Sequence, residues 1–423
     1  MTRRREVRAG LLHGLGNVLP AVTGLVTAPL TARALGVLDR GTVTVVMTAA
    51  TLFSIPAIAG MGWGTLIAVG KDPAALPVWK RRARRVALVA SLPGAVLVVW
   101  LATVLPLTAA QTAAAALLFA YASSIAVHAV NSNFLVSVGS IAPVGVSSIA
   151  LSVVTTGLLV ILFVSGQLTL ATVVLANVAG LLTQSAVLFW AARRAARRIA
   201  GRPTAPAEQT PEADAPTRRR LFMTAIAQTL DAFSARLDLI VIALVAEARV
   251  IGLYSIAAVI PQISYFAYLT LVQRSFARSP ALTIEQRSRH LFLVCSGASI
   301  ALAAAGGAAS WVLIDPIFGT EFGQARDYLW PAMLVTLGLG AFIPTLLLWQ
   351  RAGRRALVAL GVVVVIAGAA ILVGRVASPW WGIVALGAGL GTTGLTQYVG
   401  RWGWQSLFRG HVVAWRSVAR GVA

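Results

Sequence analysis

Long apolar runs without a charged residue follow one another along most of the 423-residue chain. A transmembrane helix needs about 20 consecutive apolar residues. Uncharged windows of that length lie at 9–32, 41–70, 250–273, 290–314, 328–350, 356–374 and 376–400, and 221–245 is a further apolar window that holds three charges. The pattern predicts a series of membrane-spanning helices.

The longest uncharged block, 86–192, contains no Asp, Glu, Lys or Arg. It has room for four helices of about 25 residues. Turn-prone residues divide it near 106–111, 137–143 and 165–169. Together with the other windows, the block gives about twelve spans. We therefore predict an all-α polytopic membrane protein with that number of transmembrane helices.

The composition restricts the classes of function. Charged residues make up 11% of the chain, whereas about 25% is usual in soluble proteins. The net charge is nevertheless +22. Soluble proteins that bind nucleic acid are rich in charge as well as basic, so the composition argues against a nucleic-acid partner and against a soluble enzyme.

Motifs of catalysis and cofactor binding are missing from the sequence. Cys295 is the only cysteine, which excludes an intrachain disulfide, and the four histidines show no metal-ligand spacing. There is no G-x-x-x-x-G-K-S/T phosphate loop. The largest predicted outer loop, 315–327, is too short for a catalytic domain. We expect no metal, no cofactor and no enzymatic activity.

The basic residues fall on one side of the predicted membrane when the N-terminus is placed in the cytoplasm and the spans alternate. Only Arg33, Arg40, Arg249, Arg326 and Arg375 then lie outside, and one arginine lies within a span, so 29 of the 35 cations lie inside. This is the distribution that the positive-inside rule describes. We predict a multi-pass plasma-membrane protein with both termini in the cytoplasm.

A proline-rich hydrophilic stretch divides the spans evenly. Residues 193–220 hold four prolines between polybasic flanks, a composition typical of a linker whose flanks contact the anionic lipids of the inner leaflet. We predict a six-helix lobe over 1–192, a cytoplasmic linker over 193–220 and a second six-helix lobe over 221–400. Residues 401–423 mix tryptophan with arginine, as interfacial helices do; a disordered basic tail is the alternative.

Two lobes of equal size and orientation predict parallel repeats related by a pseudo-two-fold axis along the membrane normal. The two halves share short patterns. Gly41 opens the second predicted helix after an acidic turn, and Gly252 opens the eighth in the same way. Such a pair of bundles encloses a central cavity and rocks about it.

Ionisable residues within a span are costly and mark cavities or interhelical partners. The seventh predicted helix carries Asp231, Arg236 and Asp238. We expect Arg236 either to face a cavity or to pair with another helix, Asp238 to have a structural role, and Asp231 to be a candidate for binding a coupling ion. Because guanidinium groups bind phosphate oxygens in a bidentate fork, Arg236 and Arg33 favour an anionic cargo.

Uncharged polar residues add to the predicted cavity. His13 and Asn17 lie one turn apart on the first helix, and the fourth and sixth helices hold further polar groups. Each of these groups is also explained by an ordinary hydrogen bond between helices. The candidates on the fourth and sixth helices are His128, Asn131, Asn133, Asn177 and Gln184, of which we rank Asn131 with His13 and Asn17 as cavity residues.

Several strings resemble a known family. Arg236-Leu-Asp-Leu-Ile-Val-Ile242 followed by Gly252-Leu-Tyr-Ser-Ile-Ala257 resembles the helix seven–eight signature of polysaccharide flippases of the multidrug/oligosaccharidyl-lipid/polysaccharide (MOP) exporter superfamily. Ala32-Arg-Ala-Leu-Gly36 with Asp39-Arg-Gly41 is similar to the first outer turn of that family. Ile317-Phe-Gly-Thr-Glu-Phe-Gly-Gln-Ala325, leading to Trp349-Gln-Arg-Ala-Gly-Arg354, is similar to its helix nine–ten region.

The resemblance implies two six-helix lobes in a V around a central cavity, working by alternating access. It implies export of a polyprenyl-pyrophosphate-linked oligosaccharide from the inner to the outer leaflet for cell-envelope polysaccharide biosynthesis, with glycan assembly or polymerisation proteins as candidate partners. A cation-coupled multidrug antiporter of the same superfamily is the alternative. Its cationic cargo calls for carboxylates in the cavity, whereas the first helix offers His13 and Asn17.

Overall fold

The computed structural model describes residues 3–58, 60–72, 75–200, 226, 233, 236–278, 284–350 and 354–402. Every regular element among these residues is a helix. The chain divides into two compact units, the first comprising 1–36 and 46–229 and the second comprising 37–45 and 230–423. Eight of the described helical segments are long and apolar enough to cross a membrane. The chain is thus an all-helical, multi-pass membrane protein.

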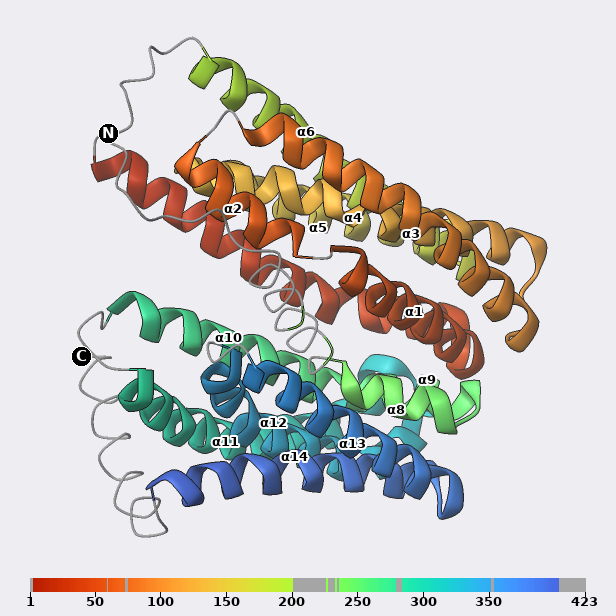
Figure 1. Cartoon of the computed structure of the whole chain (residues 1–423). Helices are drawn as coiled ribbons and strands as arrows, with labels where there is room; N and C mark the ends of the chain where they lie inside the picture. Colours follow the sequence, from red (N-terminus) through yellow and green to blue (C-terminus); the bar gives the residue numbers. More distant parts are fainter. Residues whose placement is uncertain are drawn as a thin grey trace. The chain divides into compact units, whose positions relative to one another are not determined.

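The first unit is a bundle of long helices, coloured red to light green in Figure 1. Its elements are α1 (Arg3–Ile58, except its 37–45 segment), α2 (Met61–Lys71), α3 (Leu76–Val104), α4 (Ala109–Ser137), α5 (Ala142–Val164) and α6 (Leu170–Ala200). Helix α4 packs on α2, α3 and α6, and α5 packs on α6. The uncharged block of the sequence therefore forms a single bundle in which α4 is central.

The turns between these helices lie where the sequence predicted breaks. Thr108 caps α4: its hydroxyl accepts a hydrogen bond from the backbone N–H of Gln111, and its own N–H donates to the Gln111 side chain. Gly139 (φ 73°) follows α4, and Gly166 (φ 68°) follows α5. Both glycines adopt the left-handed conformation that ends helices and is costly for other residues.

One end of the first unit gathers two basic segments that are far apart in the sequence. Trp79 and Ala83 near the start of α3 pack with Leu188 and Ala192 near the end of α6. The basic residues of 80–85 and 193–198 therefore lie at the same end of the bundle. This arrangement agrees with the predicted placement of both segments on one side of the membrane.

Helix α1 does not follow the predicted boundaries. Gly36 (φ 70°, ψ −179°) bends α1 sharply, but helix continues on both sides of it, so the predicted outer turn is reduced to a single bend. The predicted window 41–70 is not one helix, because Gly60 (φ 70°) separates α1 from α2. The span predicted there is therefore shorter and broken.

The described part of the second unit contains eight further elements and the 37–45 segment of α1. They are α8 (Leu237–Val245), α9 (Ala248–Ala257), α10 (Val259–Arg278), α11 (Ile284–Phe318), the 3₁₀ segment η2 (Thr320–Tyr328), α12 (Leu329–Gln350), α13 (Arg354–Val376) and α14 (Pro379–Trp402). Helix α12 packs on both α11 and α14, and α13 packs on α14. Phe292 of α11 stacks on Tyr398 of α14, with ring centroids 4.2 Å apart.

Residues 37–45 pack against α9 at a crossing of two glycines. A Cβ atom added at Gly41 would overlap the carbonyl oxygen of Ala248, and one added at Gly252 would overlap the carbonyl oxygen of Val37. Backbone therefore meets backbone at this point, with no side chain between the helices. The contact attaches a segment from the N-terminal part of the sequence to the second unit.

The predicted linker needs one correction. Helix α6 continues to Ala200. Residues 193–200, which were predicted to begin the linker, are therefore part of α6, and their basic side chains project from a helix. Residues 201–225 of the predicted linker and 403–423 of the predicted tail lie outside the described residues. The predicted outer loop 315–327 is helical on both sides of Gly319: it holds the end of α11 and most of η2, and Arg326 pairs there with Asp315 at 2.8 Å.

Candidate functional site

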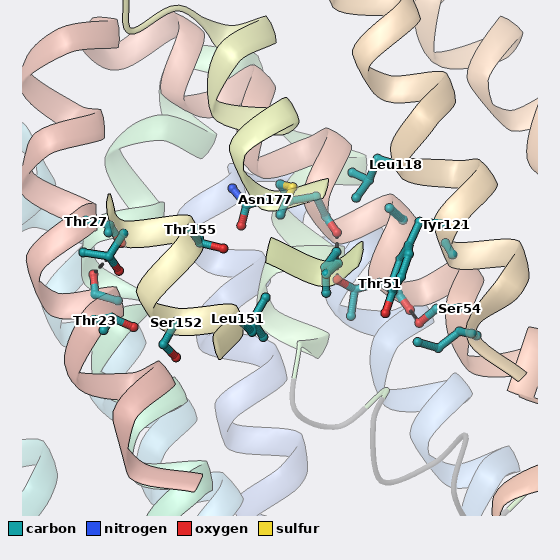
Figure 2. A pocket seen from close by; sticks show the side chains of 17 residues that line it. Thr23, Thr27, Thr51, Ser54, Leu118, Tyr121, Leu151, Ser152, Thr155 and Asn177 are labelled. Atoms are coloured by element: carbon teal, nitrogen blue, oxygen red, sulfur yellow. Dashed lines mark hydrogen bonds between the residues drawn. The ribbon is translucent and has the colours of Figure 1, made fainter. Parts of the chain in front are cut away.

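A pocket of about 350 Å³ lies inside the first unit, between α1, α4, α5 and α6. Figure 2 shows the side chains that line it. Helix α1 contributes residues from both sides of its bend at Gly36, and this bend brings Thr27 and Thr51 to one pocket. Leu118 and Tyr121 come from α4, and Asn177 comes from α6.

Hydroxyl groups dominate the polar lining of the pocket. Its hydroxyl-bearing residues are Thr23, Thr27, Thr51, Ser54, Tyr121, Ser152, Thr155 and Thr156. No Asp, Glu, Lys, Arg or His belongs to the lining given by the described residues. The pocket thus offers neutral hydrogen-bonding groups among apolar side chains, and no charge to pair with a charged ligand.

Most helical hydroxyls in membranes bond to their own backbone, and several here do so. Thr51 donates to the carbonyl oxygen of Met47 at 2.8 Å, and Ser54 donates to that of Thr51 at 2.6 Å. The hydroxyl oxygens of Ser152 and Thr155 differ, because both are buried and make no hydrogen bond within the described residues. Buried polar atoms without partners are uncommon and costly. These two, three residues apart on α5, are available to a ligand or to water.

A second polar group reaches the pocket through Tyr121. The Nδ1 atom of His128 lies 3.0 Å from the Ser185 hydroxyl and 3.4 Å from that of Tyr121, and the two hydroxyls are 3.2 Å apart. His128 itself is not part of the lining. Of the polar residues predicted on the fourth and sixth helices, Asn177 lines the pocket, and His128 contacts its wall.

Two other predicted cavity residues, Asn131 and Arg33, lie outside this pocket. Asn131 is 3% exposed in α4, its side-chain oxygen has no partner within the described residues, and it does not line the pocket. Arg33 is exposed on α1. His13 and Asn17 are on α1, but their side chains are outside the described part of the chain, as is the whole of Asp231.

Arg236 and Asp238 lie in the second unit, at the start of α8. Asp238 is 3% exposed, and its Oδ2 accepts a hydrogen bond of 2.8 Å from the Tyr254 hydroxyl of α9. The contact joins α8 to α9, which is the structural role predicted for Asp238. Arg236 is half-buried, and its guanidinium makes no hydrogen bond within the described residues.

Replacing Tyr254 with phenylalanine is expected to destabilise the protein by about 2 kcal/mol, because it leaves a buried carboxyl oxygen without its donor. A thermal-unfolding series in detergent measures the change. Tyr328→Phe is the control, since Tyr328 packs edge-on against Tyr254 but does not donate to Asp238. Equal stability of Tyr254→Phe and the wild type would contradict a structural hydrogen bond.

Sequence reasoning missed two features of these sites. Arg40 was placed in an outer turn, but it is 8% exposed; its Nε donates to the Ser255 hydroxyl at 2.8 Å and its guanidinium lies over the Phe318 ring. Arg40 thus helps to hold 37–45 in the second unit. The hydroxyl pocket was also missed. The spacing of Ser152, Thr155 and Thr156 on one face of a helix without charged residues is the signal that identifies it.

Comparisons with known proteins show which solved structures have a similar fold. No family model and no curated protein matches the sequence. A mutant MATE transporter of Vibrio cholerae matches with a TM-score of 0.59 and 13% identity, over 97% of this chain and 98% of that chain. An inward-facing multidrug resistance MATE family transporter of the MOP superfamily matches with a TM-score of 0.57 and 13% identity, over 93% and 95%.

A third similar structure is a MOP superfamily transporter from Pyrococcus furiosus, with a TM-score of 0.50 and 13% identity over 95% of both chains. At this level of identity the likeness concerns the fold. It shows that the predicted resemblance extends to the fold. The chain therefore has the all-helical fold of MOP superfamily membrane transporters.

Proposed function

We propose that this protein moves a polyprenyl-pyrophosphate-linked oligosaccharide from the inner to the outer leaflet of the plasma membrane by alternating access. In this proposal the chain forms about twelve spans in two six-helix lobes related by a pseudo-two-fold axis, and both termini are cytoplasmic. The observation that carries the proposal is the pocket of the first unit, whose described lining is rich in hydroxyl groups and contains no acidic residue.

Sugars are recognised through many neutral hydrogen bonds combined with apolar contact. The pocket offers this combination, since Ser152 and Thr155 have unpaired hydroxyl oxygens and Leu118 and Leu151 supply apolar surface. Its volume of about 350 Å³ suits one or two sugar rings. A glycan of several sugars would therefore occupy the pocket with one part only.

The second candidate is a multidrug antiporter, because the similar structures include multidrug resistance MATE transporters. A cationic drug is held by carboxylates that replace its lost hydration. The pocket has none among its lining residues. The Pyrococcus furiosus transporter is described as having a binding pocket of reverse polarity that suggests a different function, so pocket chemistry is a reasonable guide to cargo within this fold.

The test is transport in proteoliposomes with two cargoes, a lipid-linked oligosaccharide and a fluorescent organic cation. We expect flipping of the first and no movement of the second. Replacing Ser152 with alanine and Thr155 with valine together should slow flipping about tenfold, because two hydrogen bonds to the cargo are lost. Leaflet accessibility of the glycan to a periodate label measures the rate.

Thr103→Val is the matched control, because the Thr103 hydroxyl is exposed on α3 and donates to its own helix at Trp100. It should leave flipping unchanged. Movement of the cation without movement of the oligosaccharide would replace the proposal by the antiporter. Wild-type flipping by the double variant would remove the pocket from the proposed mechanism.

A further inference from the structure

A second cavity, of about 860 Å³, lies at the end of α6 in the first unit. Four arginines of α6 line it: Arg193, Arg194, Arg197 and Arg198. The opposite wall consists of Ser140, in the turn after α4, and Pro143, in the first turn of α5. This cavity is called the α6 arginine groove below.

The spacing of the four arginines concentrates their charge on one helix face. Arg193 and Arg197 are four residues apart, as are Arg194 and Arg198, so they form two adjacent rows along α6. Among the described residues, no acidic side chain lines the groove, and the one ion pair is Arg326–Asp315, in the other unit. The groove therefore offers several guanidinium forks that no carboxylate of the described chain neutralises.

Trp190 places the groove at the depth of lipid headgroups. It lines the groove, is 65% exposed and packs edge-on against Phe189, with ring centroids 6.2 Å apart. Exposed tryptophan is typical of the membrane–water interface. The candidate span of α6, Leu170–Ile199, also ends at the groove. Headgroup phosphates of the membrane therefore reach the groove more readily than soluble anions do.

The chemistry favours a pyrophosphate group over a single phosphodiester. Guanidinium binds unesterified phosphate oxygens in bidentate pairs. A pyrophosphate has more charge and more such oxygens than the phosphodiester of a bulk anionic lipid, so it can engage arginines of both rows. We propose that the α6 arginine groove binds the pyrophosphate headgroup of a membrane lipid. The inference rests on the proposed lipid-linked cargo, whose headgroup it would capture at the inner leaflet.

The test uses the full-length protein in phosphatidylcholine nanodiscs and glycan-free polyprenyl pyrophosphate as the probe. Replacing Arg193 and Arg197 with glutamine is expected to weaken binding about tenfold, because charge-assisted hydrogen bonds are lost. The matched control is Arg81→Gln with Arg85→Gln. These two exposed arginines have the same spacing at the same end of the bundle but do not line the groove. Native mass spectrometry gives the affinities.

Two further arms identify the ligand. Phosphatidylglycerol at equal charge should compete poorly, and inorganic pyrophosphate should compete only at much higher concentration than the lipid. An equal loss of affinity in both arginine pairs would overturn the proposal in favour of a general basic surface. Equal competition by phosphatidylglycerol would overturn the preference for pyrophosphate, and equal affinity for inorganic pyrophosphate would overturn the lipid source.

The outcome is separable from that of the proposed function. The glycan-free probe has no sugar to occupy the hydroxyl pocket. The Ser152→Ala, Thr155→Val double variant should therefore bind the probe with the same affinity as the wild type. Replacing Arg193 and Arg197 with lysine keeps the charge but removes the bidentate fork, and we expect it to restore less than half of the lost affinity. Complete rescue by lysine would contradict bidentate recognition.

Discussion

Replacing Gly252 with alanine is expected to detach residues 37–45 from α9 and to destabilise the second unit by about 3 kcal/mol, the upper part of the range for overpacking. The added Cβ would overlap the carbonyl oxygen of Val37. A backbone carbonyl cannot rotate away as a side chain can, so the two helices must separate. Thermal unfolding in detergent and limited proteolysis near residue 45 measure the effect, and Gly41→Ala should act in the same way.

Gly361→Ala is the control for this prediction. Gly361 lies on α13 in the same unit, and nothing lies within 4 Å of a Cβ built there. Alanine has the higher helix propensity, so stability should stay the same or rise slightly. If Gly252→Ala unfolded at the same temperature as Gly361→Ala, the close glycine crossing would not be a feature of the protein in the membrane.

Replacing Arg236 with alanine is expected to reduce glycan export at least about tenfold while the protein stays inserted and folded. The reason is electrostatic. Arg236 is half-buried at the start of α8, and the nearby carboxylate of Asp238 is held by Tyr254. Within the described residues its guanidinium has no hydrogen bond, so an anionic group of the cargo would satisfy it. Flipping in proteoliposomes measures the loss.

The matched control is Arg249→Ala. Arg249 is an exposed arginine of α9 in the same unit, and its contact with Gln324 is long, at 3.4 Å. Its loss should leave both export and stability unchanged, since exposed polar contacts contribute little. Export at the wild-type level by the Arg236→Ala variant would contradict the proposal that Arg236 contacts an anionic group of the cargo. Unfolding of that variant would instead support the alternative from the sequence, in which Arg236 pairs with another helix.

The sequence predicted the class of fold and most helix boundaries for local reasons. Apolar runs of bilayer length and the turn residues near 106–111, 137–143 and 165–169 are properties of short segments. Helices α4 and α5 begin and end at these turns, and α6 begins at the last of them. The assignment of 37–45 to the second unit was not predictable in this way. It depends on Arg40 and Gly41 meeting α9, more than 200 positions away in the sequence.

The candidate site was predicted less well, because charged residues stand out in an apolar sequence and hydroxyl groups do not. Ionisable residues in a span stand out in a sequence, so Arg236 and Asp238 were chosen as candidates. The contact of Asp238 with Tyr254 agrees with a structural role for Asp238, and the role of Arg236 stays a prediction. Serine and threonine are common in membrane helices and usually bond to their own backbone. The unpaired hydroxyls of Ser152 and Thr155 become visible only when α1, α4, α5 and α6 are packed together.

The crossing at Gly41 and Gly252 has the form of an isologous interface. Val37 precedes Gly41 by as many residues as Ala248 precedes Gly252. Gly41 approaches the carbonyl oxygen of Ala248, and Gly252 approaches that of Val37. Two identical subunits related by a two-fold axis make contacts of this reciprocal kind. Because the close approach is reciprocal, each side of the crossing depends on its own glycine, and a larger residue on either side would separate both contacts.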